Sequence, residues 1–310
     1  MKAERLVING RGEEKIIRYS SLLPQSQEIH LPNRDPIQVD WRRNFDRIKQ
    51  IQEILKSCDI TQEEGEYRVR VDNPSSPYAL GVVFSDAHIG SSTTDHQLIQ
   101  DMLELTLNTP NSFLIDVGDT FDNGIWGGLQ FEQTIPPYMQ RFTIKDIARE
   151  LGDKFAAVVV GNHPEWMFNV SGEKPEHLFY EDVAGAIFAG MGMLHLKAGD
   201  QTYHIAMAHN YWGKSKLNIH NTCRRLREVE YPEADVSIVG HEHIWGYMKE
   251  MIAGRDVLYV RPGTAKTEDR YARMHGIAKR GQKMGIGIVF GMTERYLEAM
   301  PIKDAVDFVK

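Results

Sequence analysis

Side chains that bind metals recur at five places along the sequence. The seven residues are Asp86, His88, Asp119, Asn162, His209, His241 and His243. Carboxylate, amide and imidazole donors together suit divalent ions such as Mn²⁺, Fe, Zn²⁺, Ni²⁺ or Co²⁺. One carboxylate can bridge two ions, and two ions about 3.5–4 Å apart can clamp both oxygens of an in-line displacement at phosphorus, with metal-held water as the nucleophile. These residue types predict a two-metal site for phosphate-ester hydrolysis, with Mn²⁺ as the first choice of ion.

None of these motifs is specific by itself. Asp-x-His and His-x-His arise often by chance, and a single histidine is more often a hydrogen-bonded structural residue than a ligand. Asp119 alone could be a turn residue or a helix cap, and Gly161-Asn162 could be an ordinary turn. The interpretation depends on the motifs appearing in series, each at the end of a strand. The sequence has no Gly-x-Ser-x-Gly elbow and no Walker-type phosphate loop, so the chemistry is not expected to use a protein nucleophile.

Short apolar runs predict the strands that position these residues. The expected strands are residues 80–84, 112–117, 155–160, 203–208, 236–239, 257–260 and 286–290. Helical periodicity is present over residues 95–107 and 138–151. Strands alternating with helices indicate an α/β core with much parallel sheet, and the strand-dense final third indicates a second sheet packed on the first.

The candidate ligands follow five different strand ends. Ligand sites in open α/β sheets collect in the crevice beyond the carboxyl ends of the strands, so we expect the seven side chains to meet there. Gly118, Gly161 and Gly240 each precede a candidate ligand, which suits a tight turn or a close approach to a neighbouring loop.

The chain is expected to divide at the turn-rich hexapeptide 72–77, Asp-Asn-Pro-Ser-Ser-Pro. Before it, one amphipathic helix is predicted by apolar residues at three- and four-residue steps: Trp41, Phe45, Ile48, Ile51 and Leu55. Residues 66–71 then alternate like a strand. We therefore expect an N-terminal extension over residues 1–74 and the site-bearing domain over residues 75–310.

Composition and charge narrow the class of protein. The 310 residues carry a net charge of −7 and 42% hydrophobic residues, which is ordinary for a globular protein. No stretch approaches a membrane span and no export signal is visible, so a cytoplasmic protein with no membrane partner is expected. Cys58 and Cys223 have no paired spacing, so neither a disulfide nor a thiolate site is predicted. The acidic balance argues against a protein that coats nucleic acid, but not against a nuclease, whose metals dominate the local field.

One segment departs from this acidic balance. Residues 261–283 contain seven basic side chains, namely Arg261, Lys266, Arg270, Arg273, Lys279, Arg280 and Lys283. Such a run is either solvated surface or a surface that contacts substrate phosphates. For the second possibility the candidates are Arg270, Arg273, Lys279 and Arg280.

The motifs in series resemble a known family. In order they are Asp86-Ala-His88, Gly118-Asp119-Thr-Phe-Asp122, Gly161-Asn162-His163, His209 and Gly240-His241-Glu-His243. This series resembles the calcineurin-like metallophosphoesterases over roughly residues 80–265. The resemblance implies a four-layer α/β/β/α sandwich with the metals at the sheet edge.

The resemblance also implies roles for individual residues. One metal would be held by Asp86, His88, Asp119 and His243. The other would be held by Asn162, His209, His241 and the bridging Asp119. His163 would be catalytic, either by protonating the leaving oxygen or by stabilising the charged transition state.

The clearest departure from the family pattern concerns this histidine. Pro164 follows His163, where the family has an acid that orients the imidazole. Glu165, one place later, is the candidate substitute. Asp122 fits its motif position, and we expect it to contact the metal ligands rather than to bind a metal itself.

The branch of the family can be narrowed further. Asn123 follows Asp122 where the Ser/Thr protein phosphatases have an arginine, and purple acid phosphatases have a tyrosine at the position of Asp122. The first two motifs are similar to those of repair nucleases of the Mre11/SbcD type, and the chain resembles stand-alone bacterial and phage phosphoesterases. We expect a two-metal phosphodiesterase acting on DNA, RNA or a nucleotide. The alternatives are a phosphomonoesterase for a small metabolite and a non-catalytic scaffold, and the sequence predicts no particular oligomeric state.

Overall fold

The structure is a computed structural model that describes residues 4–8, 14–18, 41–125, 127–215, 217–267 and 284–310. The chain forms two compact units, Met1–Cys58 and Asp59–Lys310. In the first unit, β1 (Glu4–Ile8) pairs antiparallel with β2 (Glu14–Arg18), and α1 spans Trp41–Ser57. The amphipathic helix predicted in this region is therefore confirmed.

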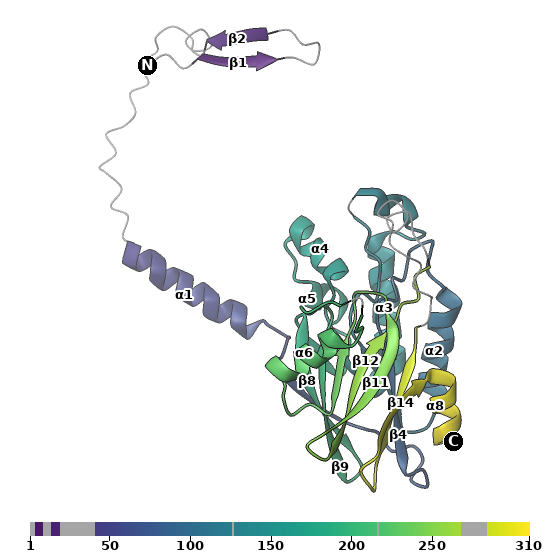
Figure 1. The fold of residues 1–310 in the computed structure, drawn as a ribbon. Helices are drawn as coiled ribbons and strands as arrows, with labels where there is room; N and C mark the ends of the chain where they lie inside the picture. Colours follow the sequence, from purple (N-terminus) through teal and green to yellow (C-terminus); the bar gives the residue numbers. More distant parts are fainter. Residues whose placement is uncertain (1–3, 9–13, 19–40, 126, 216, 268–283) are drawn as a thin grey trace. The chain divides into compact units, whose positions relative to one another are not determined.

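The larger unit contains two six-stranded sheets (Figure 1). Sheet I has the strand order β14-β13-β4-β5-β6-β7. Its strands are β4 (Tyr78–Phe84), β5 (Ser112–Asp116), β6 (Phe155–Val159), β7 (Ala186–Phe188), β13 (Ile286–Gly291) and β14 (Leu297–Pro301). β4 to β7 run parallel to one another, while β13 pairs antiparallel with both β4 and β14.

Sheet II has the strand order β11-β12-β10-β9-β8-β3. Its strands are β3 (Glu64–Arg68), β8 (Met191–Ala198), β9 (Gln201–Ala208), β10 (Val236–Val239), β11 (Trp245–Ile252) and β12 (Arg255–Pro262). β9, β10 and β12 run parallel, and β8 and β11 each pair antiparallel with the strand that follows them in the chain. β3 precedes the boundary predicted at residue 74, and that boundary stays a prediction.

Strand β4 explains why the strand sequences are continuous apolar runs. Val83 packs in the hydrophobic cluster between the two sheets, whereas Val82 and Phe84 pack in the cluster on the other face of sheet I. Successive side chains of a strand point to opposite faces, so a strand buried on both faces shows no polar alternation. Each such buried side chain stabilises the fold by roughly 1.5–3 kcal/mol.

Helices cover the outer faces of both sheets. The helices are α2 (His96–Asn108), α3 (Pro137–Leu151), α4 (Asn162–Ser171), α5 (Pro175–Phe179), α6 (Asn221–Val229) and α8 (Ile302–Val309), with short 3₁₀ segments at Gly127–Glu132 and Gly152–Lys154. α2, α3 and α8 share a cluster with sheet I, and α6 shares one with sheet II. Figure 1 shows α6 on the opposite side of the sheets from α2 and α8.

Helix α2 starts where the sequence provides a cap. The side chain of Asp95 accepts a hydrogen bond from the backbone nitrogen of Leu98 at 3.0 Å. This bond satisfies one of the free donors of the first turn. On the helix, Ile99 and Met102 are buried against sheet I.

The layers follow the order helix, sheet, sheet, helix. The cluster between the sheets contains Phe113 and Ile115 from sheet I together with Ile205 and Ile238 from sheet II. The predicted fold class, a four-layer α/β/β/α sandwich, is confirmed by this arrangement. Among the described helices, none has the length and apolar character needed to cross a membrane.

Candidate metal centre

The seven candidate ligands come from five strand ends, three in sheet I and two in sheet II. Asp86 and His88 follow β4, Asp119 follows β5, and Asn162 follows β6. His209 follows β9, and His241 and His243 follow β10. Because these strands all deliver their carboxyl ends to the same edge, both sheets contribute to one site.

The backbone of these loops is held in an unusual conformation. Positive φ angles of 49° to 67° occur at Asp86, His88, Asp119, His241 and His243. Such left-handed conformations cost side-chain-bearing residues on the order of 1 kcal/mol or more and persist where surrounding contacts impose them. Five of the seven candidate ligands are therefore placed by backbone that other interactions must hold.

All three glycines predicted to allow close approach do so, Gly118 with a Cβ position 2.5 Å from His209 Nδ1. A Cβ atom at Gly161 would lie 2.1 Å from Asp119 Oδ1, and one at Gly240 would lie 2.3 Å from Ser85 Oγ. Real Cβ atoms do not approach other atoms so closely. Only glycine lets these strand ends pack directly against the loops that carry Asp86 and Asp119.

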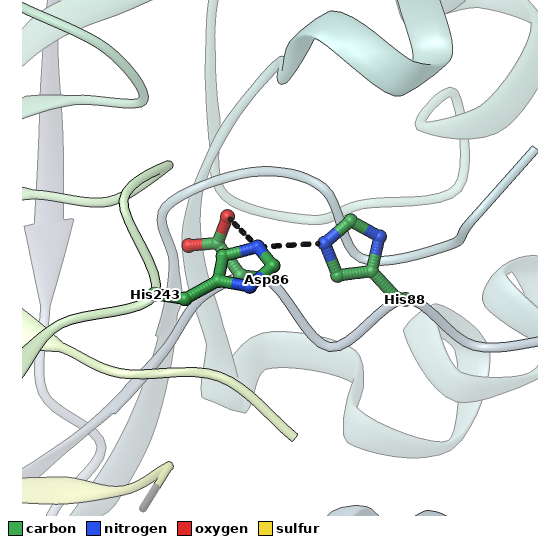
Figure 2. A group of neighbouring side chains, drawn as sticks. All are labelled: Asp86, His88 and His243. Atoms are coloured by element: carbon green, nitrogen blue, oxygen red, sulfur yellow. Dashed lines mark hydrogen bonds and ion pairs between the residues drawn. The ribbon is translucent and has the colours of Figure 1, made fainter. Parts of the chain in front are cut away.

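Asp86, His88 and His243 form the first cluster, shown in Figure 2. The Nε2 atoms of His88 and His243 are 3.1 Å apart, and His243 Nε2 lies 3.4 Å from Asp86 Oδ1. One ligand atom from each residue lies within 4.8 Å of the others. The three donors converge on a volume that suits one ion.

The two oxygens of Asp86 have different surroundings. Oδ2 accepts hydrogen bonds from Ser85 Oγ at 2.5 Å and from the backbone nitrogen of His241 at 2.9 Å. Oδ1 is buried and makes no hydrogen bond. A buried carboxylate oxygen without a hydrogen bond is costly, so its position facing His243 fits a metal ligand.

Asp119, His209 and His241 form the second cluster, with Asn162 beside it. His209 Nε2 lies 3.1 Å from Asp119 Oδ2 and 3.0 Å from Asn162 Oδ1. His209 Nδ1 lies 2.8 Å from the carbonyl oxygen of Val117, which fixes the ring. This group also matches divalent-ion chemistry, because it combines carboxylate, amide and imidazole donors.

The electrostatics of the two clusters differ. In the first, burial and the charges of His163 and Lys266 lower the pKa of His88 to about 4. In the second, burial alone would lower the pKa of His209, but the Asp119 carboxylate outweighs it and raises the value to about 10. The charge of His209 in turn holds the pKa of the Asp119 carboxyl well below its usual range, against the opposing effect of burial. At neutral pH the metal-free second cluster therefore contains an ion pair.

Acidic residue Asp122 lies behind the first cluster. Its Oδ1 atom accepts a hydrogen bond from Lys266 Nζ at 2.9 Å and lies 3.0 Å from His88 Nδ1. Oδ2 accepts a hydrogen bond from the side chain of Gln133. A carboxylate against the outer nitrogen of a ligand histidine fixes the ring and its tautomer, so Asp122 leaves His88 Nε2 facing the cluster.

His163 lies between the clusters and is oriented by backbone atoms. Its Nδ1 is hydrogen bonded to the carbonyl oxygen of Asp122, and its Nε2 lies 3.8 Å from Asp119 Oδ2. The ring of Trp166 packs against the imidazole, with 4.0 Å between centroids and 32° between the ring planes. Glu165, the predicted substitute for the acid missing at Pro164, is exposed. The orientation of His163 is therefore supplied by the Asp122 main chain and Trp166.

The basic segment is not uniformly solvated. Arg261 is 1% exposed and Lys266 is 4% exposed. Arg261 contacts the two residues that flank His241, and Lys266 contacts Asp122, which lies against His88. Sequence reasoning missed both contacts. The candidate substrate contacts Arg270, Arg273, Lys279 and Arg280 lie outside the described residues.

Sequence reasoning also missed Lys214, an exposed residue in the loop after His209. Its charge acts on His241: burial, the charge of His209 and that of Lys214 lower the pKa of His241 to about 4. Trp212, in the same loop, is 54% exposed, and the Arg225 guanidinium lies 5.0 Å from its ring centre. For Lys214 the available signal was its short distance from His209 in the sequence.

Comparisons with known proteins find similarity only among solved structures. No family model matches the sequence, and no curated protein sequence matches it. Vacuolar protein sorting 29 from Cryptosporidium parvum aligns at a TM-score of 0.41 and 12% identity, over 74% of this chain and 93% of the other. The calcineurin-like phosphoesterase YfkN from Bacillus subtilis aligns at 0.36 and 12%, over 76% and 99%.

A third structure, the NAD nucleotidase from Haemophilus influenzae, aligns at a TM-score of 0.38 and 11% identity. The alignment covers 72% of this chain and 49% of the nucleotidase, about half its length. At TM-scores below 0.5 these likenesses do not identify a function. A functional assignment must rest on the residues and geometry of the site.

Proposed function

We propose that this chain is a phosphohydrolase that uses two divalent metal ions, most directly a phosphodiesterase acting on DNA, RNA or a nucleotide. The observation that carries the proposal is the convergence of the first and second clusters at one edge of two sheets. The buried and unbonded Oδ1 atom of Asp86 supports a metal there. The resemblance of the motif series to calcineurin-like metallophosphoesterases supports the same chemistry.

The chain's own residues divide the work of such a reaction. When bound, two divalent ions would supply the attacking water and compensate the charge on the phosphate. Asp119, buried beside His209 at 3.1 Å, would bridge the two sites. The remaining ligands would be Asp86, His88 and His243 on one side, and Asn162, His209 and His241 on the other. Mn²⁺ is the proposed ion because the carboxylate and amide oxygens suit it, while the imidazoles also suit Fe, Zn²⁺ or Ni²⁺.

His163 would act on the leaving group. With Nδ1 hydrogen bonded to the Asp122 carbonyl, its Nε2 is the atom that faces the reaction centre. A histidine held in this way can protonate the leaving oxygen or stabilise negative charge on the phosphate, which is worth about 10²- to 10⁴-fold in rate. Trp166 limits rotation of the ring by packing against it.

A nucleic acid or nucleotide substrate is supported by the residues that border the site. Exposed Trp212 offers a ring on which a base could stack, and Lys214 adds a positive charge near His241. Arg270, Arg273, Lys279 and Arg280 remain proposed contacts for substrate phosphates. Replacing Arg270 and Arg273 by alanine should raise KM for the accepted substrate, and an unchanged KM would remove them from the proposal.

The proposal is tested by an activity screen with Mn²⁺. The substrates are single-stranded DNA, duplex DNA, RNA, cyclic nucleotides, bis-p-nitrophenyl phosphate and p-nitrophenyl phosphate. We expect cleavage of diesters, and cleavage of the monoester alone would replace the phosphodiesterase by a phosphomonoesterase for a small metabolite. A protein that takes up no metal and cleaves nothing would be a scaffold.

Two variants show whether any activity belongs to this site. Asp119→Asn removes the proposed bridging charge and should abolish cleavage. Asp200→Asn changes an exposed aspartate in the turn between β8 and β9 and should have no effect. Equal activity of the two variants would assign the cleavage to a contaminant.

A further inference from the structure

We infer that the segment Arg261–Thr267, at and beyond the end of β12, positions the ligand loops of both clusters, with Arg261 and Lys266 as its two buried positioning residues. The inference rests on the proposed function, because it concerns how the metal ligands are held. Sequence alone placed these cations in a basic surface run. Their burial and their partners indicate an internal role.

Arg261 holds the loop that carries His241 and His243. Its Nη2 atom donates to the carbonyl oxygen of Gly240 at 3.1 Å and to Glu242 Oε2 at 2.9 Å. Gly240 and Glu242 are the two sequence neighbours of His241. The planar guanidinium can reach both at once, so one side chain fixes both flanks of a ligand.

The other side of the Arg261 guanidinium is anchored in the protein. Nη1 donates to Thr222 Oγ1 at 2.5 Å and to the carbonyl oxygen of Ile219 at 3.2 Å. Thr222 lies in α6, which packs on sheet II. Arg261 therefore links the His241–His243 loop to a helix rather than to solvent.

The middle of the segment holds the backbone of Asp86. Thr264 Oγ1 donates to the Asp86 carbonyl oxygen at 2.6 Å, and the backbone nitrogen of Ala265 donates to the same oxygen at 3.3 Å. Thr94, which forms an isolated β-bridge with Lys266, donates through Oγ1 to the carbonyl oxygen of His88 at 2.7 Å. Both ligands on the β4 loop are thereby tied to this segment.

Lys266 acts on the first cluster through Asp122. Its ammonium group lies 2.9 Å from Asp122 Oδ1, the same oxygen that lies 3.0 Å from His88 Nδ1. His88, Asp122 and His163 form a third group with metal-ligand spacing. The ammonium group of Lys266 lies against Asp122, the only carboxylate in this third group. The third group therefore serves to orient His88 rather than to bind an ion.

These contacts help to hold the strained backbone of two ligand loops. Asp86, His88, His241 and His243 all have positive φ angles. Such conformations persist where the surroundings over-determine them. The segment Arg261–Thr267 contacts both loops that carry these four residues, so it supplies part of that constraint.

The two cations should have distinguishable effects on metal binding. Lys266 contacts the partner of one ligand, His88, in the first cluster. Arg261 holds a loop that supplies His243 to the first cluster and His241 to the second. Loss of Lys266 should therefore weaken one metal site, and loss of Arg261 should weaken both.

The test is Mn²⁺ binding by calorimetry to the metal-stripped full chain. In Lys266→Met we expect one of two dissociation constants to rise about 10-fold, and in Arg261→Met both, as for other residues that orient ligands. The matched control is Arg295→Met, which removes the partner of buried Asp235 at the opposite end of β10. Its two dissociation constants should equal those of the wild type.

Several outcomes overturn the inference without touching the proposed function. Two sites of wild-type affinity in both Lys266→Met and Arg261→Met would do so, as would an equal loss in all three variants, which would indicate general destabilisation. If Arg261→Met does not fold, Glu242→Gln removes the carboxylate partner of Arg261 and should weaken both sites. Failure of the wild type to bind Mn²⁺ would instead overturn the proposed function.

Discussion

The first and second clusters use the same residue types, yet they balance charge differently. In the first, His88 has a pKa lowered to about 4, and Asp122 with Lys266 lies behind it. In the second, His209 has a pKa raised to about 10 by Asp119, and a main-chain carbonyl of Val117 lies behind it. In the metal-free protein the proton on His209 thus supplies a positive charge that a bound metal ion would otherwise supply.

This difference teaches how a two-metal site can stay folded without metal. Carboxylates buried at one edge of two sheets repel each other and lose hydration, so each needs a positive partner. Asp119 has His209 at 3.1 Å, while Asp122 has Lys266 at 2.9 Å. The first partner is an imidazole, which loses its charge when it is deprotonated, whereas the second is a lysine ammonium group.

The largest expected effect comes from the residue that both metal sites share under the proposal. Asp119→Asn should lower kcat by at least about 10³-fold, because groups that act as a unit fail together. It should also reduce the number of bound Mn²⁺ ions, since the bridging charge is lost. Steady-state kinetics and metal analysis of the purified variant check both expectations. Retention of two tightly bound ions would show that Asp119 does not bridge.

His163→Asn should separate catalysis from metal binding. We expect kcat to fall by about 10²-fold, the usual contribution of a positioned acid or base, with both Mn²⁺ dissociation constants unchanged. The reason is that the His163 ring is held by Asp122 and Trp166. Its backbone nitrogen donates to Asp119 Oδ1 at 2.9 Å, a bond that the substitution retains. Kinetics and calorimetry on the same preparation measure the two effects, and weakened metal binding would make His163 a ligand instead.

Asp122→Asn should affect the first cluster alone. Because Asp122 Oδ1 lies 3.0 Å from His88 Nδ1, loss of its charge should raise one Mn²⁺ dissociation constant about 10-fold. The second site should keep its affinity. Asp153→Asn, at an exposed carboxylate, is the control. A change in both constants would mean that the clusters are not independent.

The pH dependence of Mn²⁺ binding should arise from the second cluster. With the pKa of His209 at about 10 and those of His88 and His241 at about 4, Mn²⁺ binding near pH 7.5 should release about one proton. Calorimetry in buffers of different ionisation enthalpy counts this proton. His209→Asn should release none, and an equal release from that variant would place the proton elsewhere.

The same histidine predicts how the metal-free protein responds to pH. Its folded-state pKa of about 10 lies above the ordinary value of 6.5. The stabilisation from His209 is therefore complete below pH 6.5 and is lost as pH rises towards 10. Urea unfolding of the metal-free protein should show a smaller free energy of unfolding at pH 9.5 than at pH 7.5, and His209→Asn should lessen that difference.

The strands that lead into the candidate ligands could be predicted, because strands buried on both faces are rich in apolar residues. The runs that end before Asp86, Asp119 and His241 consist mainly of apolar residues, and each forms a strand. Helix α6 (Asn221–Val229) was missed because only a narrow stripe, including Cys223 and Leu226, is buried. At nine residues the helix is also shorter than the stretch over which apolar periodicity is usually recognised.

The supports of the site could not be predicted for a different reason. His163 is oriented by the main-chain carbonyl of Asp122, and a main-chain atom leaves no trace in residue type. Arg261 can be buried because it pairs with Glu242, which lies across a hairpin from it in the sequence. Lys266 can be buried because it pairs with Asp122, which lies far from it in the sequence. A charged run therefore suggested surface where the fold provides buried partners.

The most direct test of the two-cluster account is a crystal structure of the Mn²⁺-soaked protein with anomalous diffraction at the manganese edge. The account predicts two peaks on either side of Asp119, one against Asp86, His88 and His243, and one against Asn162, His209 and His241. A single peak among His88, Asp122 and His163, or no peak near Asp119, would contradict it.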